Sequence, residues 1–389
     1  MQHPSRSPVC FSGLLPHSLG FQSQAGKRIG VGRKDDLPLH PTFGPIALLG
    51  SGETSLSGGR IFESLVQNLP SPLRIVILET PAGFELNSSQ VVGRVADFLG
   101  TRLQYFDPTV TVLPARKRGT PFSPDNAALL APLLSANLIF MGPGSPTYAV
   151  RQLRGSLAWD ILRARQRMGA ALVFASAATI AVGARALPVY EIYKVGEDVS
   201  APPGLDLFAD FGLPLSFIPH WNNAEGGADV DTSRCFVGME RFDEWRALLP
   251  PGHITVGLDE HTGLIFDFAL GQCRVNGVSS VTLLRECNPK IYPAGATISF
   301  AELGEFHLPV LPEEGIPAST WKMVMDAASP GQENGEIPAE VQRMAEARQQ
   351  ARLRKDWVAA DELRQQIESL GWRVDDTTAG PKLFPGKGD

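Results

Sequence analysis

Three residues that could carry out nucleophilic chemistry, Ser176, His220 and Glu260, each stand at the end of an apolar segment. The segments that precede them are 172–175, 215–219 and 254–259. A serine hydroxyl becomes an effective nucleophile when a histidine takes its proton and a carboxylate orients that histidine. We therefore predict a hydrolase in which Ser176 is the nucleophile, His220 the general base and Glu260 the acid that orients the base.

The sequence around Ser176 predicts a sharp turn from a strand into a helix. Small residues follow the serine, and such residues let the turn form and leave the hydroxyl exposed. The usual G-x-S-x-G pattern is altered, however, because Phe174 and Ala178 replace its two glycines. Two interpretations therefore stay open: an active serine hydrolase, and a catalytically degenerate binding protein on the same scaffold.

An acyl-transfer reaction also needs hydrogen-bond donors for the oxyanion that forms on the substrate. The backbone N–H of Ala177, directly after the serine, is one candidate. The second candidate is Gly144 in the segment 142–145, because glycine permits a close approach and Pro143 has no N–H to offer. A plain strand-to-helix turn is the alternative interpretation of that segment.

Other residues compete for these roles or suggest different chemistry. Asp259 and His261 flank Glu260, so they stay open as alternatives for the acid and the base. A metal site at His220, Glu260 and His261 lacks a diagnostic spacing, and the Gly-x-Gly at 50–52 lacks the third glycine of a dinucleotide loop. We expect neither a metal nor another cofactor.

The segments that must position these residues alternate between two patterns. Short apolar runs are typical of strands buried on both faces, and they occupy residues 46–49, 74–78, 110–113, 138–141 and 171–174. Segments with helical spacing lie between them, at residues 60–69, 89–99, 124–134 and 157–168. This alternation predicts an α/β fold with a doubly wound, mostly parallel sheet, whose ligands bind at the carboxyl ends of the strands. Further strand-like runs follow at 189–193, 214–219, 254–258, 264–268, 272–275 and 281–285.

Composition divides the chain into four parts. Residues 1–44 are rich in Pro, Ser, Gly and Arg and predict a disordered N-terminal extension. Residues 45–303 hold the predicted α/β domain, and residues 304–338, rich in Pro, Gly and Glu, predict a linker. Residues 339–389 are highly charged and predict a helical hairpin, with Asp356 as the N-cap of its second helix.

At the residues described first, the chain resembles the serine peptidase family of cyanophycinase and the bacterial aspartyl dipeptidases. The resemblance covers about residues 45–300 and rests on the segments 50–53, 140–144, 174–179, 218–221 and 256–262. It implies a class I glutamine-amidotransferase-like α/β fold with flavodoxin-like layers. It also implies hydrolysis of amide bonds in short peptides, often next to an acidic residue. Ser176, His220 and Glu260 fall on the nucleophile, the base and the triad acid of that family.

One departure from the family concerns substrate binding. The family has arginines after its histidine, whereas residues 222–227 intervene at that place in this chain. Arg234 is the nearest equivalent, so the resemblance makes it a candidate clamp for a substrate carboxylate, which a guanidinium binds bidentately. A surface arginine on a helix is the alternative interpretation. The serine at the elbow argues against the glutaminase chemistry of related amidotransferases, which depends on a thiolate.

The C-terminal part has a separate resemblance. Residues 340–382 resemble the last helices of cysteinyl-tRNA synthetase, mainly through 347–364 and 371–377. A contact with tRNA would use the basic side chains Arg348, Arg352, Arg354 and Lys355. Nearby acidic residues nearly balance their charge, and a solvated hairpin is the alternative interpretation, packed on Trp357, Leu363, Ile367 and Leu370. The sequence has no signature of synthetase catalysis.

The overall composition narrows the expected partners and location. A net charge of −6 gives no general reason to expect nucleic-acid binding, and no apolar run reaches the length of about 18 residues that a membrane helix needs. The four cysteines show no C-x-x-C spacing, as fits reduced thiols: Cys10, Cys235, Cys273 and Cys287. We therefore expect a cytoplasmic protein that acts on a small peptide or amide. A homo-oligomer and an RNA contact through the C-terminal hairpin stay open.

Overall fold

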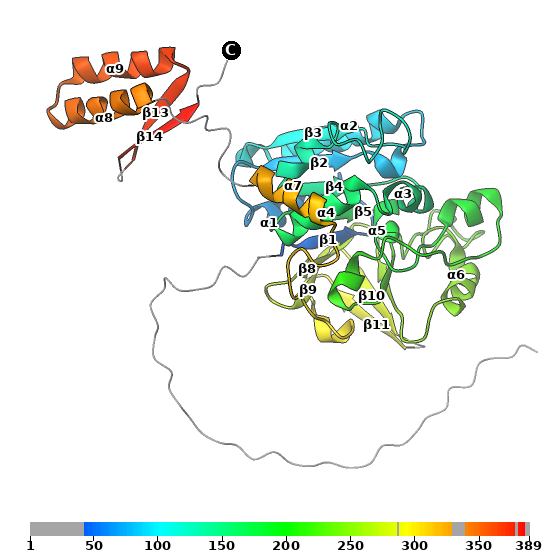
Figure 1. The fold of residues 1–389 in the computed structure, drawn as a ribbon. Helices are drawn as coiled ribbons and strands as arrows, with labels where there is room; N and C mark the ends of the chain where they lie inside the picture. Colours follow the sequence, from blue (N-terminus) through cyan, green and yellow to red (C-terminus); the bar gives the residue numbers. More distant parts are fainter. Residues whose placement is uncertain (1–42, 286–287, 329–338, 378–379, 386–389) are drawn as a thin grey trace, which may run out of the picture. The chain divides into compact units, whose positions relative to one another are not determined.

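A large sheet forms the centre of the α/β body in the computed structural model, which describes residues 43–285, 288–328, 339–377 and 380–385 (Figure 1). Its eight strands run in the order β12-β9-β8-β1-β5-β4-β2-β3. Five neighbouring strands are parallel: β1 (Ile46–Leu49), β5 (Ala171–Ala175), β4 (Leu138–Met141), β2 (Arg74–Leu78) and β3 (Thr109–Leu113). Antiparallel strands extend the other edge: β8 (Thr262–Asp267), β9 (Gln272–Gly277) and β12 (Thr297–Ser299). The predicted α/β fold with a mostly parallel sheet is confirmed.

The central parallel strands β1, β4 and β5 are apolar and buried along their whole length because helices cover both faces of the sheet. Successive side chains of β1 pack alternately into two different hydrophobic clusters. One cluster takes side chains from α3 (Pro146–Leu153) and α4 (Leu157–Arg167). The other cluster takes side chains from α1 (Leu56–Val66) and α2 (Ser88–Arg102). The expected layers are thus present on both sides of the sheet.

A second, four-stranded sheet in the order β11-β10-β7-β6 carries two of the predicted site residues. Its strands are β6 (Leu215–Ile218), β7 (Ile254–Leu258), β10 (Ser280–Arg285) and β11 (Asn288–Pro293). β6 and β7 are parallel, so they end at the same edge, shortly before His220 and Glu260. The N–H of His220 donates to the carbonyl of Gly50 at 3.2 Å, which joins this edge to the end of β1. The expected site therefore lies where two sheets meet rather than at the edge of one sheet.

The segment 124–134, which we expected to be helical, has a different form. Only the 3₁₀ helix η3 (Ala131–Ser135) forms near its end. The side chains of Ser123 and Asn126 accept hydrogen bonds from nearby backbone N–H groups. Such local bonds favour turns over a helix, and the predicted helix is wrong for that reason.

The segment 189–193, which we expected to be a strand, is also different. It overlaps the π-helix η4 (Glu191–Val195). Val189 and Ile192 are buried in the same cluster, at the spacing of one helical turn. The N–H of Ile192 donates to the carbonyl of Pro188 at 3.0 Å, so the backbone bonds are local rather than to a neighbouring strand.

The segment 304–338, which we expected to be a linker, contains a helix of the α/β body. This helix, α7 (Ala318–Ala328), contacts α4 and η3, and its residue Val324 is fully buried. The helix buries only a narrow stripe, which is why its apolar pattern is weak in the sequence. Residues 304–317, before this helix, form turns and irregular backbone, and Ile316 among them is buried in the main hydrophobic cluster. Residues 329–338 of the expected linker lie outside the described residues.

The C-terminal part is a unit of two helices and a β-hairpin: α8 (Ala339–Leu353), α9 (Trp357–Ser369), β13 (Trp372–Thr377) and β14 (Gly380–Pro385). The side chain of Asp356 accepts from the N–H of Ala359 at 3.2 Å, so Asp356 is the N-cap that we predicted. Ile367 is fully buried, but Trp357 is 55% exposed and Leu370 is 46% exposed. The expected packing on Trp357 and Leu370 is wrong, because the unpredicted strand β13 packs against α9 instead. Ile367 packs with Val341, Ala345 and Val374.

Two further expectations concern the N-terminus and membranes. The expected extension at residues 1–44 lies almost entirely outside the described residues, which begin at Phe43. Within the described ranges, no helix is both long and apolar enough to cross a membrane.

Candidate active site

Ser176 lies on a sharp turn between β5 and α5 (Ala177–Ala181). Its backbone has φ +52° and ψ −116°, a conformation that costs free energy in any residue with a side chain. The hydroxyl of Thr179 lies 3.0 Å from the carbonyl oxygens of both Leu49 and Phe174, and these contacts fix the turn. The result is a strained strand-to-helix elbow at the carboxyl end of β5.

The elbow forms without the usual glycines because both replacement side chains pack in the core. Phe174 and Ala178 are fully buried and belong to the same hydrophobic cluster. The positive φ falls on Ser176 itself. The loss of both glycines is therefore compatible with the elbow geometry.

The side chains of Ser176, His220 and Glu260 converge, although they follow three different strands. Oγ of Ser176 lies 2.9 Å from Nε2 of His220, and Nδ1 of His220 lies 3.0 Å from Oε1 of Glu260. An ionised carboxylate only accepts hydrogen bonds, so Nδ1 donates to Glu260 and Nε2 is left to accept the serine proton. A nucleophile, a base and an orienting carboxylate require this order of contacts.

Glu260 is held by two asparagines that the sequence analysis did not single out. Nδ2 of Asn223 donates to Oε1 of Glu260 at 2.9 Å, and the backbone N–H of Glu260 donates to Oδ1 of Asn222 at 2.8 Å. Burial raises the pKa of Glu260, but the hydrogen bonds from Asn223 and His220 outweigh burial, and the pKa lies below its ordinary value. Glu260 is therefore ionised at neutral pH. The sequence feature that could have indicated these contacts is the adjacent pair of asparagines, Asn222 and Asn223, which begins two residues after His220.

A strained turn lies against His220. Three successive residues, Arg234, Cys235 and Phe236, have φ between +58° and +70°, a left-handed conformation that is unfavourable for residues other than glycine. The N–H of Cys235 donates to the carbonyl of His220 at 3.1 Å. The ring centroid of Phe236 lies 5.3 Å from that of the imidazole. The turn therefore restricts the orientation of the imidazole, and no sequence signal predicted it.

Arg234, the candidate carboxylate clamp, is engaged with Trp221. Its guanidinium carbon lies 3.8 Å from the centre of the Trp221 ring, and Nη1 donates to the Trp221 carbonyl at 2.8 Å. Arg234 stands on the left-handed turn rather than on a helix. These contacts support the segment that carries His220, and a role in substrate binding stays a prediction.

The alternatives for the acid and base roles have other positions. Asp259 is 5% exposed, and its Oδ2 accepts hydrogen bonds from the hydroxyls of Ser279 and Ser280 at 2.6 and 2.7 Å. Asp259 thereby anchors its loop to the start of β10. The exposed imidazole of His261 lies over Gly52, where a Cβ would come within 2.3 Å of its Nδ1.

The backbone donors expected for an oxyanion lie at the start of α5 and in the loop after β4. Ala177 is the first residue of α5, so its N–H has no acceptor within the helix. The carbonyl of Gly142 accepts from the N–H of Ala178 at 3.3 Å, so the loop lies against the elbow. Gly144 has φ +142°, and a Cβ there would lie 2.0 Å from the carbonyl oxygen of Pro81, so only glycine fits. The use of either N–H as an oxyanion donor stays a prediction.

The His, Cys, Asp and Glu side chains near one another were candidates for a metal site, and the cysteines were expected to be reduced thiols. Within the part of the chain that the structure describes, no group of three or more His, Cys, Asp or Glu side chains could hold a metal ion. Cys235 and Cys273 are buried free thiols, and burial raises the pKa of both. They pack in hydrophobic clusters of the α/β body.

His253, to which the sequence assigned no role, makes a buried hydrogen bond. Its Nε2 lies 2.9 Å from Oγ of Ser216, whose hydroxyl donates to the carbonyl of Arg185. Burial, together with the charge of Arg185, lowers the pKa of His253 from 6.5 to about 4. Below the ordinary pKa, the unfolded chain therefore binds a proton that the folded protein does not bind.

We expect the free energy of unfolding to fall as the pH decreases from about 6.5 toward 4. Between pH 7 and pH 5, His253 should account for about 2 kcal/mol of this loss. Urea unfolding at both pH values, with the wild type and with His253→Gln, measures it. The variant should lose less stability than the wild type over this interval, and an equal loss in both proteins would contradict the assignment.

The α/β body has the same fold as a solved peptidase structure. The chain is similar to a peptidase from an acI-B1 actinobacterium, with a TM-score of 0.54 and 20% identity, over 67% of this chain and 98% of that one. At this identity the likeness establishes the fold, and the expected resemblance is confirmed at that level. No family model matches the chain.

A second similarity concerns a short segment. The cysteine–tRNA ligases of Methanosarcina mazei and Chlamydia abortus are 50% and 54% identical to this chain over 48 residues. The matched segment is 12% of this chain, and the chain spans about a tenth of the length of these relatives. The resemblance to cysteinyl-tRNA synthetase is thereby confirmed for a short part of the protein.

Proposed function

We propose that this protein is a serine-type hydrolase that cleaves amide bonds in small peptides. The observation that carries the proposal is the chain of contacts from Ser176 through His220 to Glu260, at 2.9 and 3.0 Å, on a strand-to-helix elbow. The peptidase with a similar fold supports the same class of activity. The ionised state of Glu260 supports it as well, because the orienting acid must carry a charge.

The first half of the reaction acylates the serine. Oγ of Ser176 forms a bond to the carbonyl carbon of the amide, and Nε2 of His220 takes the hydroxyl proton. The carbonyl electron pair moves onto oxygen, where the N–H groups of Ala177 and Gly144 donate to the oxyanion. The C–N bond then breaks, and His220 gives its proton to the leaving amine. Glu260 stabilises the imidazolium during both proton transfers.

The second half releases the acid. His220 takes a proton from water, and the water oxygen attacks the ester carbon on Ser176. The oxyanion forms again at the same donors. The bond between Oγ and carbon breaks, His220 returns the proton to Oγ, and a carboxylic acid leaves. The enzyme returns to its starting state with one water consumed.

Labelling with a fluorophosphonate tests the proposal. The reagent modifies an activated serine, so we expect a single label on Ser176, located by mass spectrometry of the digested protein. Ser176→Ala should abolish both labelling and the hydrolysis of a di- and tripeptide library. Ser64→Ala is the matched control, because the Ser64 hydroxyl donates to the carbonyl of Ile61 within α1, and it should keep both activities.

The degenerate alternative has a distinct outcome in the same experiment. A wild-type protein that is folded, takes up no label and hydrolyses no member of the library would favour a binding protein. Full retention of hydrolysis by Ser176→Ala would exclude Ser176 as the nucleophile. In that case the strained backbone of Ser176, at φ +52°, would not be explained by catalysis.

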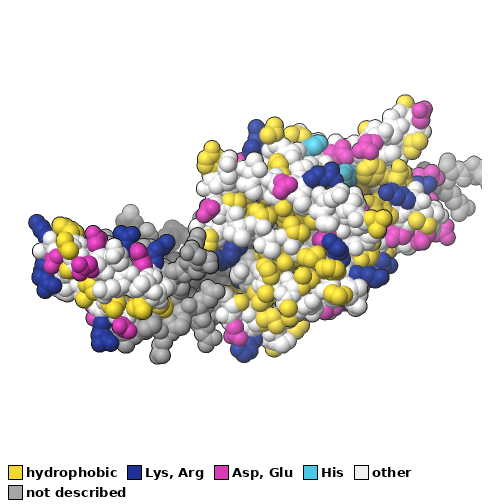
Figure 2. Space-filling view, turned by 90° about the horizontal axis from the view of Figure 1, so that it is seen from above, with side chains coloured by type: hydrophobic (Ala, Val, Ile, Leu, Met, Phe, Trp, Pro, Cys, Tyr) yellow, Lys and Arg dark blue, Asp and Glu magenta, His cyan; other side chains and the backbone are white. Residues whose placement is uncertain are grey.

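A second candidate function concerns the C-terminal unit and rests on its similarity to cysteine–tRNA ligases. We propose that this unit makes a weak contact with tRNA. The guanidinium carbon of Arg352 lies 5.6 Å from the ring centre of Trp357, which is half-exposed, and such a pair can stack on an unpaired base. Basic and acidic side chains are intermixed on the unit, which favours weak over strong binding (Figure 2).

A gel shift of the full chain with unmodified tRNA tests this second function. Trp357→Ala should weaken the shift about tenfold at low salt, because base–aromatic stacking contributes about 1–3 kcal/mol. Tyr105→Ala removes an aromatic ring that is 91% exposed on the α/β body, and it should leave the shift unchanged. Absence of a shift in the wild type at low salt would reject the contact.

A further inference from the structure

A cavity of about 380 Å³ lies beside α3, and Ser176, His220 and Glu260 are not among the residues that line it. One face of the helix and its C-cap supply Thr147, Arg151 and Arg154 to the cavity lining. Arg118 and Pro203 line it as well. Cavities of this size hold small ligands in other proteins. Three arginines therefore line one cavity of a chain whose net charge is −6.

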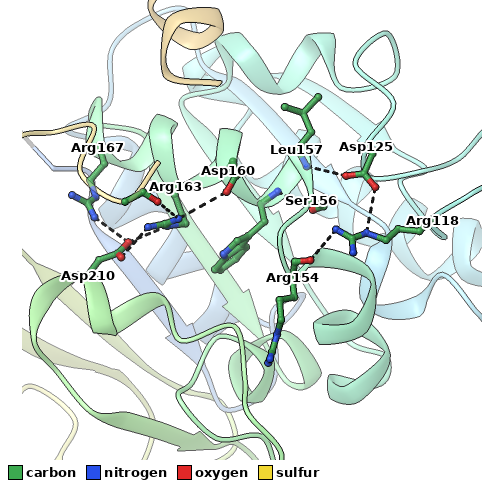
Figure 3. A network of polar contacts seen from close by, with 11 residues as sticks. Arg118, Asp125, Arg154, Ser156, Leu157, Asp160, Arg163, Arg167 and Asp210 are labelled. Carbon is green, nitrogen blue, oxygen red and sulfur yellow. Dashed lines mark hydrogen bonds and ion pairs between the residues drawn. The ribbon is translucent and has the colours of Figure 1, made fainter. Parts of the chain in front are cut away.

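Two of these arginines are held in place by carbonyl groups, which do not neutralise their charge. Nη2 of Arg154 donates to the carbonyl oxygens of Pro203 and Gly204 at 2.7 and 2.6 Å. Nη2 of Arg118 donates to the carbonyl of Arg154 at 2.8 Å (Figure 3). The guanidinium groups are therefore fixed before any ligand arrives.

The third arginine is held by a ring. The guanidinium carbon of Arg151 lies 5.3 Å from the ring centre of Tyr148, and its side chain is exposed. This contact leaves the charge of Arg151 in place. It also leaves its N–H groups available on the side away from the ring.

Nearby carboxylates offset only part of the positive charge. Nε of Arg118 lies 3.3 Å from Asp125. Glu191 accepts a hydrogen bond from the hydroxyl of Thr147. Burial raises the pKa of Asp206, and the charge of Arg154 opposes this in part. Among the described residues that line the cavity, none is acidic.

We propose that this cavity binds a small anion with two or more adjacent negative groups, either phosphates or carboxylates. A guanidinium binds both groups bidentately, and arginines that are already held lose less side-chain entropy on binding. Arginines at the end of a helix also interact favourably with its dipole, but this accounts only for their position on α3. It does not account for Arg118, which comes from another segment.

The anion site and the elbow are close along the chain but distinct. α3 begins directly after the loop 142–145 and rises about 1.5 Å per residue, so Arg151 lies about 9 Å along the helix from that loop. The proposal does not depend on hydrolysis at Ser176, and direct binding tests it. Its failure and the failure of the proposed function are therefore distinguishable.

Calorimetric titration of the full chain with inorganic pyrophosphate and, separately, with citrate tests the proposal. We expect one saturable site for at least one of the two anions, with an affinity that decreases as salt is added. Arg151→Gln should weaken it about tenfold, as expected for one lost charge-assisted hydrogen bond. Because Arg151 makes its described contact with a ring, this variant keeps the backbone contacts that Arg154 and Arg118 make.

Matched variants decide the outcome. Arg94→Gln removes an exposed arginine from α2 and should leave binding unchanged. Saturable binding of pyrophosphate alone identifies a phosphate ligand, and binding of both anions identifies any small polyanion. No saturable binding of either anion, or the same affinity in Arg151→Gln as in the wild type, would overturn the proposal.

Discussion

Glu260→Gln is expected to lower peptide turnover by about 10³- to 10⁴-fold while leaving the protein folded. Glutamine keeps the shape of the side chain but has no charge to stabilise the imidazolium of His220. Its amide group can also donate to Nδ1 and so hold the imidazole in the wrong tautomer. The 3.0 Å contact between Nδ1 and Oε1 would then no longer direct the lone pair of Nε2 toward Ser176. Single-turnover kinetics on the best peptide of the library measures the effect.

Asp259→Asn is the matched control for this prediction, because it makes the same chemical change one residue earlier. Asp259 accepts hydrogen bonds from Ser279 and Ser280, so its replacement should lower stability more than turnover. Turnover of Glu260→Gln within a few-fold of the wild type would contradict the role of Glu260. A large loss in Asp259→Asn alone would point to the alternative acid.

Asp210→Ala is expected to lower the free energy of unfolding by about 3–5 kcal/mol. Asp210 lies 2.9 Å from Nη2 of Arg167, a side chain that is 1% exposed, and it also receives two hydrogen bonds from Arg163 (Figure 3). Without the carboxylate, Arg167 loses the partner of this ion pair and stays a buried charge. Burial already lowers the pKa of Arg167, which reflects the cost of its charged form. Urea unfolding measures the loss.

Two further variants separate this cause from general damage. The double variant Asp210→Ala with Arg167→Met replaces the pair by apolar groups and should recover much of the lost stability. Asp326→Ala removes one partner of an exposed ion pair with Lys322 on α7 and should cost less than about 1 kcal/mol. Equal losses in the single and double variants would show that the uncompensated charge is not the cause.

The positions of the converging residues could be predicted because each follows a buried strand. Ser176, His220 and Glu260 come after short, mostly apolar runs, and such runs mark strands covered on both faces. The partners of those strands could not be predicted. An apolar run carries no information about which neighbour it pairs with, so the division into two sheets appears only in the structure.

The parts of the site that escaped prediction depend on tertiary contacts. The turn at Arg234, Cys235 and Phe236 is left-handed without a glycine, so its sequence gives no turn signal. Its conformation is maintained by the bond of Cys235 to the His220 carbonyl and by the packing of Phe236 on the imidazole. Asn223 likewise lies in a polar loop, where nothing in the sequence marks it as part of the site. Only its 2.9 Å contact with Glu260 distinguishes it from any solvated amide.

The helix α7 escaped prediction for a different reason. The residues around it in the sequence are rich in Pro, Gly and Glu. Because the composition was judged over the whole segment, these residues concealed the narrow apolar stripe of the helix. Val324 and Ile316 nevertheless belong to the main hydrophobic cluster. Compositional boundaries therefore place the end of the α/β body too early.

Ser176 follows a strand of the large sheet and His220 follows a strand of the four-stranded sheet, and the bond from His220 to Gly50 joins the two sheets beside the site. A slip of about 1 Å between reacting groups can cost about a hundredfold in rate. The rate of hydrolysis should therefore depend strongly on how well the two sheets stay aligned. On heating, we expect the activity to be lost at temperatures at which both sheets still keep their secondary structure.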